Sequence, residues 1–532
     1  MAKVKIYLTD FRSFKSHKAF FKNIHDKSPD HDGKYIIYFD GPVDWKKAKN
    51  LLCCFFSDPD NFKNVTVFHQ HKNKAGGRYE ILQKMELTKD GKFNSDLLEL
   101  DSDGAVCRIN GLVGTLNRTV KIGSEEYDVT LEMRSRFDER DKPWLLGTML
   151  EIALQGNVKF NSIENNIASD ELDLLGILSV TLFCSTLKSA YKSGVYKTYV
   201  RREYNDSRLR GTLDIPRHIR LNVGRNDTVA AYTTRELTYD NELNHLIMHA
   251  WNFLRSMYPK IADALIYGSS RDDELYSIIT ELKSMTAATD MRLDRCAAKC
   301  QRPITGPFYM KYEELRKLCL RIIGYRAKAN IFSGNGENVS GILFYSPDLW
   351  EVCCEERMRD VLKGHGYEIT AQVEMKLYRH FVIDDKEKDN SLFNNNYDHD
   401  IRPDYVVYKD EKPIAVLDAK FRVLEIEDKD LNKLLRDMTC FGAHIGGLIY
   451  PHKEGADVKN NTIQAYYLGK HVNSDKKDVP ITNNKAIIYT YHVPVPDVNK
   501  NGSYNEWKEK LYKGSEDTFG RLKEHLDSLG KE

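Results

Sequence analysis

The stretch IRPDYVVYKDEKPIAVLDAKFR, residues 401–422, decides how the last part of this chain folds. Its β-branched and aromatic residues fall into two runs, 405–408 and 414–417. The polar Asp-Glu-Lys-Pro segment between these runs has the composition of a turn. The pattern therefore predicts two short strands joined as a hairpin.

Three charged side chains lie at the ends of these predicted strands. Residues two apart on a strand project from the same face, so Asp418 and Lys420 project together while Ala419 faces the other way. A hairpin brings the start of its first strand beside the end of its second, so we expect Asp404 next to Asp418. The sequence predicts two carboxylates and one ammonium at the edge of a sheet.

This combination suits a hard divalent cation. Mg²⁺ takes few protein carboxylates and keeps several waters, so Asp404 and Asp418 are its predicted ligands, with Mn²⁺ as a substitute. Lys420, beside a metal-bound water, can orient that water or help to remove its proton. The metal and the lysine can also stabilise the charge that builds on a phosphate during in-line attack.

The Asp…Asp-x-Lys arrangement closely resembles the signature of the PD-(D/E)xK nuclease superfamily. In a chain with 30% charged residues this spacing also arises by chance, and the alternative is a solvated hairpin. The place of Asp418 at the end of an apolar strand favours the nuclease. The flanking pattern predicts the order α-β-β-β-α-β, which is the core topology of that superfamily. Its elements are a helix from 346, a strand at 373–383, the hairpin, a helix at 430–441 and a strand at 444–450.

The length, the net charge and the motifs of the sequence limit the number of domains and the kinds of binding site that we expect. At 532 residues the chain is too long for one hydrophobic core, and two or three domains are expected. The net charge is only +1, so any DNA-binding surface must be a local patch. The sequence contains no Gly-x₄-Gly-Lys-Ser/Thr loop, which indicates that the chain has no NTP site of its own.

The first residues of the sequence and its cysteines indicate the cellular compartment. The opening MAKVK lacks the pattern of a secretory signal, and the ten cysteines are scattered. No segment reaches the charge-free length of a membrane span. The sequence therefore predicts a cytoplasmic protein with reduced thiols and no membrane partner.

Composition and periodicity divide the chain into four expected regions. Residues 1–95 form an α/β region without chemical motifs, and 96–140 form a small β-rich region with glycines between short strands. Residues 141–345 are mainly helical, and 346–532 form the α/β nuclease-like domain. The predicted fold class is a multidomain chain ending in a restriction-endonuclease-like α/β domain.

The densest basic and aromatic stretch of the sequence is residues 192–225. It suits contact with a phosphate backbone, and it fits a solvated surface or docking on a partner protein equally well. The candidate DNA-binding or partner-binding residues are Arg201, Arg202, Arg208 and Arg210.

Three separated stretches resemble one family, the McrC subunits of modification-dependent (type IV) restriction systems. The first is the hairpin with HIGGLIYPH, residues 444–452. The second is RLRGTLDIPRHIR, residues 208–220, with the helix that contains Asp240 and Asn244. The third is INGLVG…MRSRFD with WLLGTML, and together they cover roughly residues 106–500.

The resemblance places the family's catalytic positions on Asp404, Asp418 and Lys420. It also implies an acid from the helix that opens the domain, where Glu351 matches and Glu355 and Glu356 compete. The helix after Lys420 departs from the family. It reads DLNKLLRDMTCF instead of carrying Gln-Met and Tyr, and its Lys433 or Arg436 is a candidate for phosphate contact.

The resemblance further implies a partner, a ring-forming AAA+ GTPase of the McrB type that translocates double-stranded DNA. The expected function is a Mg²⁺-dependent endonuclease subunit of an anti-phage restriction system. The alternative is a non-catalytic adaptor that docks on the ring and activates it, and a free-standing structure-selective nuclease is a third. The Arg208–Arg220 segment could serve DNA or the partner.

Overall fold

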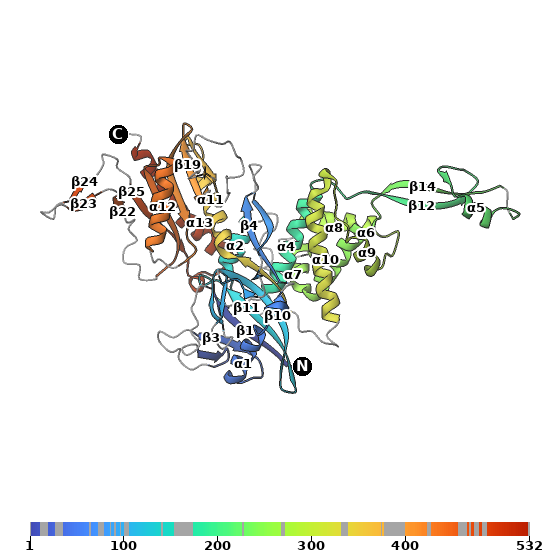
Figure 1. The fold of residues 1–532 in the computed structure, drawn as a ribbon, viewed down its shortest axis with the longest axis horizontal. Helices are drawn as coiled ribbons and strands as arrows, with labels where there is room; N and C mark the ends of the chain where they lie inside the picture. The colour runs from blue at the N-terminus through green and yellow to red at the C-terminus, as the bar shows by residue number, and fades with distance from the viewer. Residues whose placement is uncertain are drawn as a thin grey trace, which may run out of the picture. The chain divides into compact units, whose positions relative to one another are not determined.

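The computed structural model divides the chain into two compact units (Figure 1). Unit 1 contains Met1–Gly156 and Glu337–Glu532, and unit 2 is the segment between them, Asn157–Gly336. The structure describes residues 2–10, 20–26, 36–62, 65–72, 79–85, 87–89, 92–95, 97–100, 106–139, 142–153, 174–225, 228–267, 272–330, 339–373, 375–376, 400–422, 427–455, 465–467, 470–472, 478–480 and 487–529.

The first part of unit 1 is an eight-stranded mixed sheet of order β2-β3-β1-β11-β10-β15-β4-β5. The alternation in AKVKIYLT explains β1, since Val4, Ile6 and Leu8 are buried while Lys3 and Lys5 are exposed. The strands are β1 (Ala2–Thr9), β2 (Phe20–Asn23), β3 (Ile36–Asp40), β4 (Thr66–Lys72), β5 (Tyr79–Met85), β10 (Leu112–Ile122), β11 (Glu125–Arg134) and β15 (Ser340–Tyr345).

This sheet does not follow the regional borders expected at 95/96 and 345/346. Strand β1 pairs in parallel with β11, so the first residues of the chain and the expected β-rich region share one sheet. Strand β15 pairs with β10 and with β4, although unit 2 separates β10 from β15 in the sequence. Such pairing between distant segments leaves no local signal in the sequence.

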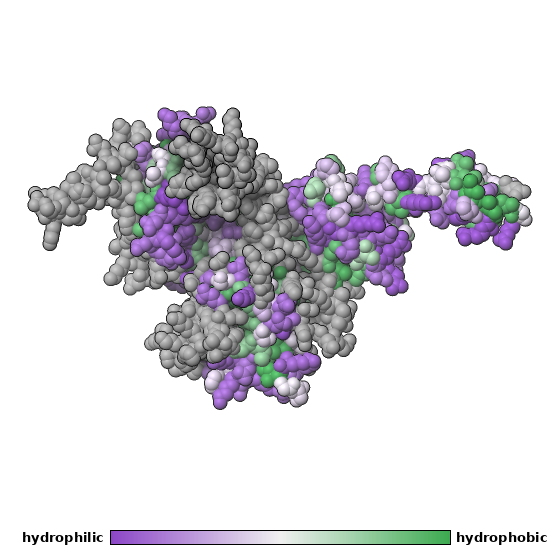
Figure 2. Space-filling view, viewed as in Figure 1, coloured by the Kyte–Doolittle hydropathy of each residue, from purple (hydrophilic) through white to green (hydrophobic). Residues whose placement is uncertain are grey.

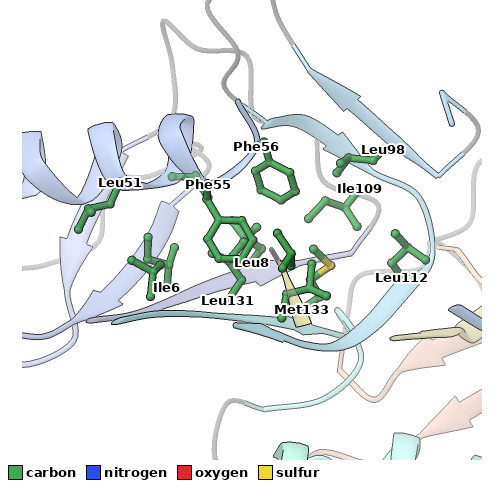
Figure 3. Close-up of a cluster of buried hydrophobic side chains, with 14 of the residues drawn as sticks. Ile6, Leu8, Leu51, Phe55, Phe56, Leu98, Ile109, Leu112, Leu131 and Met133 are labelled. Carbon is green, nitrogen blue, oxygen red and sulfur yellow. The ribbon is translucent and has the colours of Figure 1, made fainter. Parts of the chain in front are cut away.

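Helix α1 (Trp45–Phe55) covers part of this sheet, and Figure 3 shows the hydrophobic cluster that its side chains form with Ile6, Leu8, Leu131 and Met133. The side chain of Asp44 accepts a hydrogen bond from the backbone N–H of Lys47 at 2.8 Å and caps the helix. The cluster gives residues 1–95 a structural role in unit 1.

Helix α2 (Trp144–Ala153) packs on α11 (Ser346–Leu362) and α13 (Tyr504–Leu529). The rings of Trp144 and Trp507 lie 5.8 Å apart, and the hydroxyl groups of Thr148 and Tyr504 are hydrogen bonded at 2.9 Å. Helix α2 therefore belongs with the last α/β domain, and not with the helical region expected to begin at residue 141.

The last part of unit 1 is a six-stranded sheet of order β16-β19-β20-β21-β25-β22. The elements follow one another as α11, β16, β19, β20, α12 and β21, which is the α-β-β-β-α-β order expected from the sequence. Their bounds are β16 (Tyr367–Ala371), β19 (Tyr405–Lys409), β20 (Lys412–Ala419), α12 (Asp428–Phe441), β21 (Ile445–Lys453), β22 (Ala465–Tyr467) and β25 (Ile487–Val495).

The first strand of this sheet lies earlier than predicted. Strand β16 ends at Ala371, whereas the sequence indicated a strand at 373–383, and most of that range lies outside the described residues. Ile369 and Ala371 alternate as buried residues of β16, which pairs with β19. The short strands β17 (Met375–Lys376) and β18 (Asp400–Ile401) pair with each other instead.

Helix α12 packs closely on the sheet because β21 carries a glycine, Gly446, beneath it. A Cβ on Gly446 would lie only 2.4 Å from the sulfur of Met438 and 3.2 Å from a methyl of Leu434, both on α12. Met438 and Leu434 are buried in the core of this domain. The helix ends at Gly442, which has a φ of 68° and terminates it in the left-handed conformation.

Unit 2 consists of helices and one long β arm (Figure 1). Its helices are α4 (Leu174–Tyr191), α6 (Glu242–Met257), α7 (Pro259–Tyr267), α8 (Asp273–Met285), α9 (Leu293–Lys299) and α10 (Met310–Asn330). The arm, residues 198–238, contains β12 (Thr198–Asp206), β13 (Thr212–Leu213), α5 (Ile215–Leu221) and β14 (Ala230–Thr238). No helix in the described ranges is both long and apolar enough to cross a membrane.

Candidate active site

The hairpin of β19 and β20 brings the two predicted metal ligands together. Its register pairs Tyr405 with Leu417, which places Asp404 opposite Asp418. The turn residues Asp410 and Glu411 both have positive φ, at 49° and 62°, as a two-residue type I′ turn requires. The strand pairing, the turn and the position of Asp404 agree with the arrangement expected from the sequence.

Asp418 is almost fully buried, with 3% of its surface exposed. Its strand β20 runs parallel to β21, and the backbone N–H of Lys420 donates to the carbonyl of Ile449 at 2.8 Å. The ammonium of Lys420 forms an ion pair with Oδ2 of Asp418, so the two side chains share one side of the strand. The sequence analysis predicted this arrangement, because residues two apart on a strand project from the same face.

A second lysine, Lys433 of α12, reaches the same two carboxylates. Its Nζ lies 2.5 Å from Oδ1 of Asp418 and 3.8 Å from Oδ1 of Asp404. The sequence had indicated Lys433 or Arg436 only for phosphate contact. Arg436 pairs instead with its neighbour Asp437 at 2.8 Å.

Of the three candidate acids on α11, Glu351 is the one at the site. Its carboxylate accepts a hydrogen bond of 3.3 Å from the side-chain amide of Gln372. Glu355 pairs with Arg359 at 2.7 Å, and Glu356 is exposed. The phenol of Tyr405 donates to the carbonyl oxygen of Glu351 at 2.6 Å and ties this turn of α11 to β19.

Gln372 and Arg402 complete the surroundings, and the sequence did not single out either residue. Gln372 has a φ of 51°, an unusual conformation for a residue other than glycine. Its N–H donates to the carbonyl of Asp404 at 2.8 Å, and its side-chain oxygen accepts from Arg402 at 2.5 Å. Strained backbone of this kind is concentrated at functional sites.

The two aspartates differ in their electrostatic surroundings. Burial and the negative charge of Asp418 raise the pKa of Asp404 to about 7, against the opposing charges of Lys433 and Lys420. Burial also disfavours the charge of Asp418, but Lys420 and Lys433 outweigh it and hold its pKa below the ordinary value. Burial, with the charge of Asp404, raises the pKa of Glu351 well above its usual range.

These carboxylates fit a cation of the Mg²⁺ type. Among the described residues no group of three or more His, Cys, Asp or Glu side chains is arranged to hold a metal, so a closed all-protein site is not formed there. Mg²⁺ needs only one or two carboxylates because it keeps its waters. Asp404 and Asp418 already share one positive charge, that of Lys433, so the pair offers oxygens to a common cation.

The predicted arginines lie on the arm of unit 2 and are largely paired there. Arg201 lies 3.9 Å from Asp214, Arg202 3.6 Å from Glu236, and Arg210 3.4 Å from Asp206. The backbone N–H of Arg208 donates to the side chain of Asp206 at 2.9 Å. Local acids therefore offset much of the positive charge that suggested phosphate contact.

The arm also carries exposed apolar side chains, which the sequence analysis did not single out. Helix α5 has no buried residue, whereas a surface helix ordinarily packs its apolar stripe against the rest of the protein. Figure 2 shows this apolar surface at the end of the arm. The exposed residues are Tyr199, Leu209, Leu213, Ile215, Ile219, Leu221, Val223 and Leu237.

The root of the arm is fixed by two asparagines of the α6 N-terminus. The side-chain amide of Asn244 donates to the carbonyls of Tyr196 and Tyr239, at 3.0 and 2.6 Å. The amide of Asn241 donates to the same two carbonyls, at 3.1 and 3.0 Å. Tyr196 precedes β12 and Tyr239 follows β14, so these bonds hold both strands of the arm to the helices.

Comparison with known proteins shows the family of the chain. The family model described as "McrBC 5-methylcytosine restriction system component" matches residues 108–451, which is more than half of the chain. No curated protein sequence matches.

Two solved structures are similar to the chain. The first is described as a refined half-complex from a tetradecameric assembly of Thermococcus gammatolerans McrB AAA+ hexamers with bound McrC. It covers 97% of this chain and 100% of its own, with 14% identity and a TM-score of 0.48. The second, a Thermococcus gammatolerans McrBC complex, covers 67% and 88%, with 15% identity and a TM-score of 0.33. On the extent of the family-model match, the chain belongs to the McrBC family of 5-methylcytosine restriction system components.

Proposed function

We propose that the chain is the endonuclease subunit of an McrBC-type restriction system and hydrolyses phosphodiester bonds of double-stranded DNA with Mg²⁺. The observation that carries the proposal is the convergence of Asp404 and Asp418 on one shared cation position, with Lys420 beside them. Membership of the McrBC family supports the same function.

Each residue has a distinct task in this reaction. Asp404 and Asp418 would hold Mg²⁺, which when bound supplies a Lewis acid and lowers the pKa of a coordinated water. Lys420 orients the attacking water and stabilises the charge that develops on the scissile phosphate. Burial and the charge of Asp404 raise the pKa of Glu351, so its carboxyl takes up a proton more readily than an exposed glutamate does, and in its protonated form it can donate a hydrogen bond to a water at the site.

Replacement of Asp418 tests the nuclease. Asp418→Ala should abolish DNA cleavage because one remaining carboxylate holds Mg²⁺ weakly. Asp418→Asn preserves the shape of the side chain and should give the same loss. Asp428→Asn, an exposed position on α12, is the matched control. Cleavage at the wild-type rate by both Asp418 variants would remove this residue from the mechanism.

A second function, docking on a ring-forming AAA+ GTPase of the McrB type, is favoured by the arm. Exposed apolar patches of this kind mark sites of protein interaction. The arm has eight arginines against five acidic residues, so it combines an apolar surface with a small positive charge. Because Arg201, Arg202 and Arg210 pair with acids of the arm itself, we assign the arm to the partner rather than to DNA.

Two double variants separate these roles of the arm. Ile215→Ser/Ile219→Ser should prevent assembly with the GTPase and remove its stimulation, while divalent-cation binding by unit 1 persists. Arg208→Ala/Arg210→Ala should leave assembly largely intact. If the arginine variant instead weakens DNA binding with a flatter salt dependence, and the isoleucine variant assembles normally, the arm is a DNA-binding element.

The proposal also makes the chain a poor nuclease when alone. A near-neutral protein gains little DNA affinity from its overall charge, so a translocating partner must deliver the duplex. The purified chain with Mg²⁺ at physiological salt should cut DNA only when the GTPase and GTP are present. Efficient cutting without them would contradict the dependence on a partner.

A further inference from the structure

Lys433 occupies the space between the two carboxylates of the candidate active site. Its Nζ is 2.5 Å from Oδ1 of Asp418 and 3.8 Å from Oδ1 of Asp404. Lys420 is placed differently, since it contacts the other oxygen of Asp418, Oδ2, and lies 3.9 Å from Asp430. Of the two lysines, only Lys433 forms ion pairs with both aspartates. Its ammonium lies at a point that Oδ1 of Asp404 and Oδ1 of Asp418 share.

A divalent ion and the ammonium of Lys433 cannot use this point together. Mg²⁺ binds carboxylate oxygens at about 2.1 Å and Ca²⁺ at about 2.4 Å. An ion on Oδ1 of Asp418 would therefore lie within about 5 Å of Nζ, with two positive charges added to the one already present. Metal binding requires Lys433 to move away.

Lys433 can leave without disturbing the fold. Helix α12 is anchored by the buried side chains of Leu434 and Met438, and close packing on Gly446 holds it to the sheet. The side chain of Lys433 is 34% exposed, so solvent reaches part of it. A lysine has a flexible four-carbon stem and three donors, which lets the ammonium move several ångströms to another acceptor.

We propose that Lys433 is an internal competitor of the divalent metal, which leaves the carboxylates when the metal binds and then holds a phosphate of the DNA backbone. The inference rests on the proposed nuclease function and adds a coupling between metal binding and DNA binding. Because one ammonium serves both sites, metal and DNA each favour the state that binds the other. The site is then loaded with metal mainly when DNA is present.

The first test measures metal affinity without DNA. Lys433→Met should bind Mg²⁺ and Ca²⁺ about tenfold more tightly than wild type in calorimetric titrations, since a hydrogen bond between charged groups no longer has to be broken. Lys429→Met is the matched control. It removes the same charge from the same helix, but Lys429 is exposed and pairs with Glu427 at 2.5 Å. Lys433→Gln serves as a second variant of similar length if the methionine perturbs folding.

The second test measures the coupling. For the wild type, a short DNA duplex should tighten Ca²⁺ binding, and Ca²⁺ should tighten duplex binding by the same factor. In Lys433→Met this factor should fall towards one, while in Lys429→Met it should persist. The duplex is examined by electrophoresis afterwards to establish that it stayed intact.

The outcomes separate this inference from the proposed function. If wild type binds divalent cations through Asp418 and cuts DNA with its partner, but Lys433→Met and Lys433→Gln bind metal no more tightly than Lys429→Met, the competition is overturned and the nuclease stands. A weaker metal affinity in the Lys433 variants would overturn it too, because it would make the lysine a support of the site. If wild type binds no divalent cation even with the DNA duplex present, both the proposed function and this inference fall.

Discussion

The backbone N–H of Ala419 donates a hydrogen bond of 2.7 Å to Oδ2 of Asp404. Ala419 stands between Asp418 and Lys420, so the peptide that carries two of the candidate catalytic residues also holds the third. The bond leaves Oδ1 of Asp404 facing Lys433. One hydrogen bond thus sets which oxygen of Asp404 is offered to a cation.

Asp404→Asn should separate activity from stability. The amide oxygen can keep the bond from Ala419, but the charge that binds a cation is lost, so cleavage should fall to background. Above pH 7 the wild-type carboxyl must ionise in a buried site beside Asp418, which costs folding free energy. Urea unfolding at pH 8 without metal should therefore find the variant at least as stable as wild type. A large destabilisation would mean that the charge of Asp404 supports the fold.

Lys420→Ala should bind metal and DNA yet cut slowly. Removing one group that stabilises the transition state costs on the order of 10²–10³ in rate. Single-turnover cleavage at saturating DNA and Mg²⁺, with the GTPase partner present, measures the effect. A variant that binds DNA poorly but cuts at the normal rate when saturated would make Lys420 a binding residue.

Asp138→Asn should change how stability depends on pH. The Asp138 carboxylate accepts from the N–H groups of Leu145 and Leu146, at 2.7 and 3.2 Å, and burial raises its pKa to about 7. Because the folded pKa exceeds the ordinary value of 3.8, the folded state holds an extra proton between about pH 4 and 7. The contribution of this group to stability is full below pH 4 and is lost as the pH rises through 7.

Unfolding of wild type and Asp138→Asn at several pH values measures this contribution. The stability difference between them should shift in favour of the variant as the pH rises from 5 to 8, because an amide does not ionise. Asp44→Asn, which makes the same substitution at the exposed cap of α1, is the control. A parallel pH course for wild type and Asp138→Asn would exclude the raised pKa.

Asn244→Ala should loosen the arm. The variant removes one donor from each of the carbonyls of Tyr196 and Tyr239, which keep their bonds from Asn241, at a cost of about 0.5–1.5 kcal/mol per hydrogen bond lost. Hydrogen exchange should accelerate at the start of β12 and the end of β14, and stimulation of the GTPase should fall. Asn252→Ala, an exposed position on the same helix, is the control. Unchanged exchange at the root would show that Asn241 alone is sufficient.

The sequence by itself determined the part of the site that is local. Asp404, Asp418 and Lys420 belong to one hairpin, and strand alternation with a two-residue turn is enough to bring them together. The same short-range rules predicted the order of helices and strands in the last domain. They did not locate its first strand, since β16 is defined by its pairing with β19.

Tertiary structure decided everything that depends on how distant elements pack. Glu351 and Glu355 lie one turn apart on α11 and are equivalent by spacing, but Arg359 pairs with Glu355. Lys433 reaches the carboxylates only because Gly446 lets α12 pack closely on β21. Likewise, β15 completes a sheet begun by the first residues of the chain, and Arg202 of the arm meets Glu236 on its other strand. Contacts between residues far apart in the chain are set by packing, for which a local pattern carries no information.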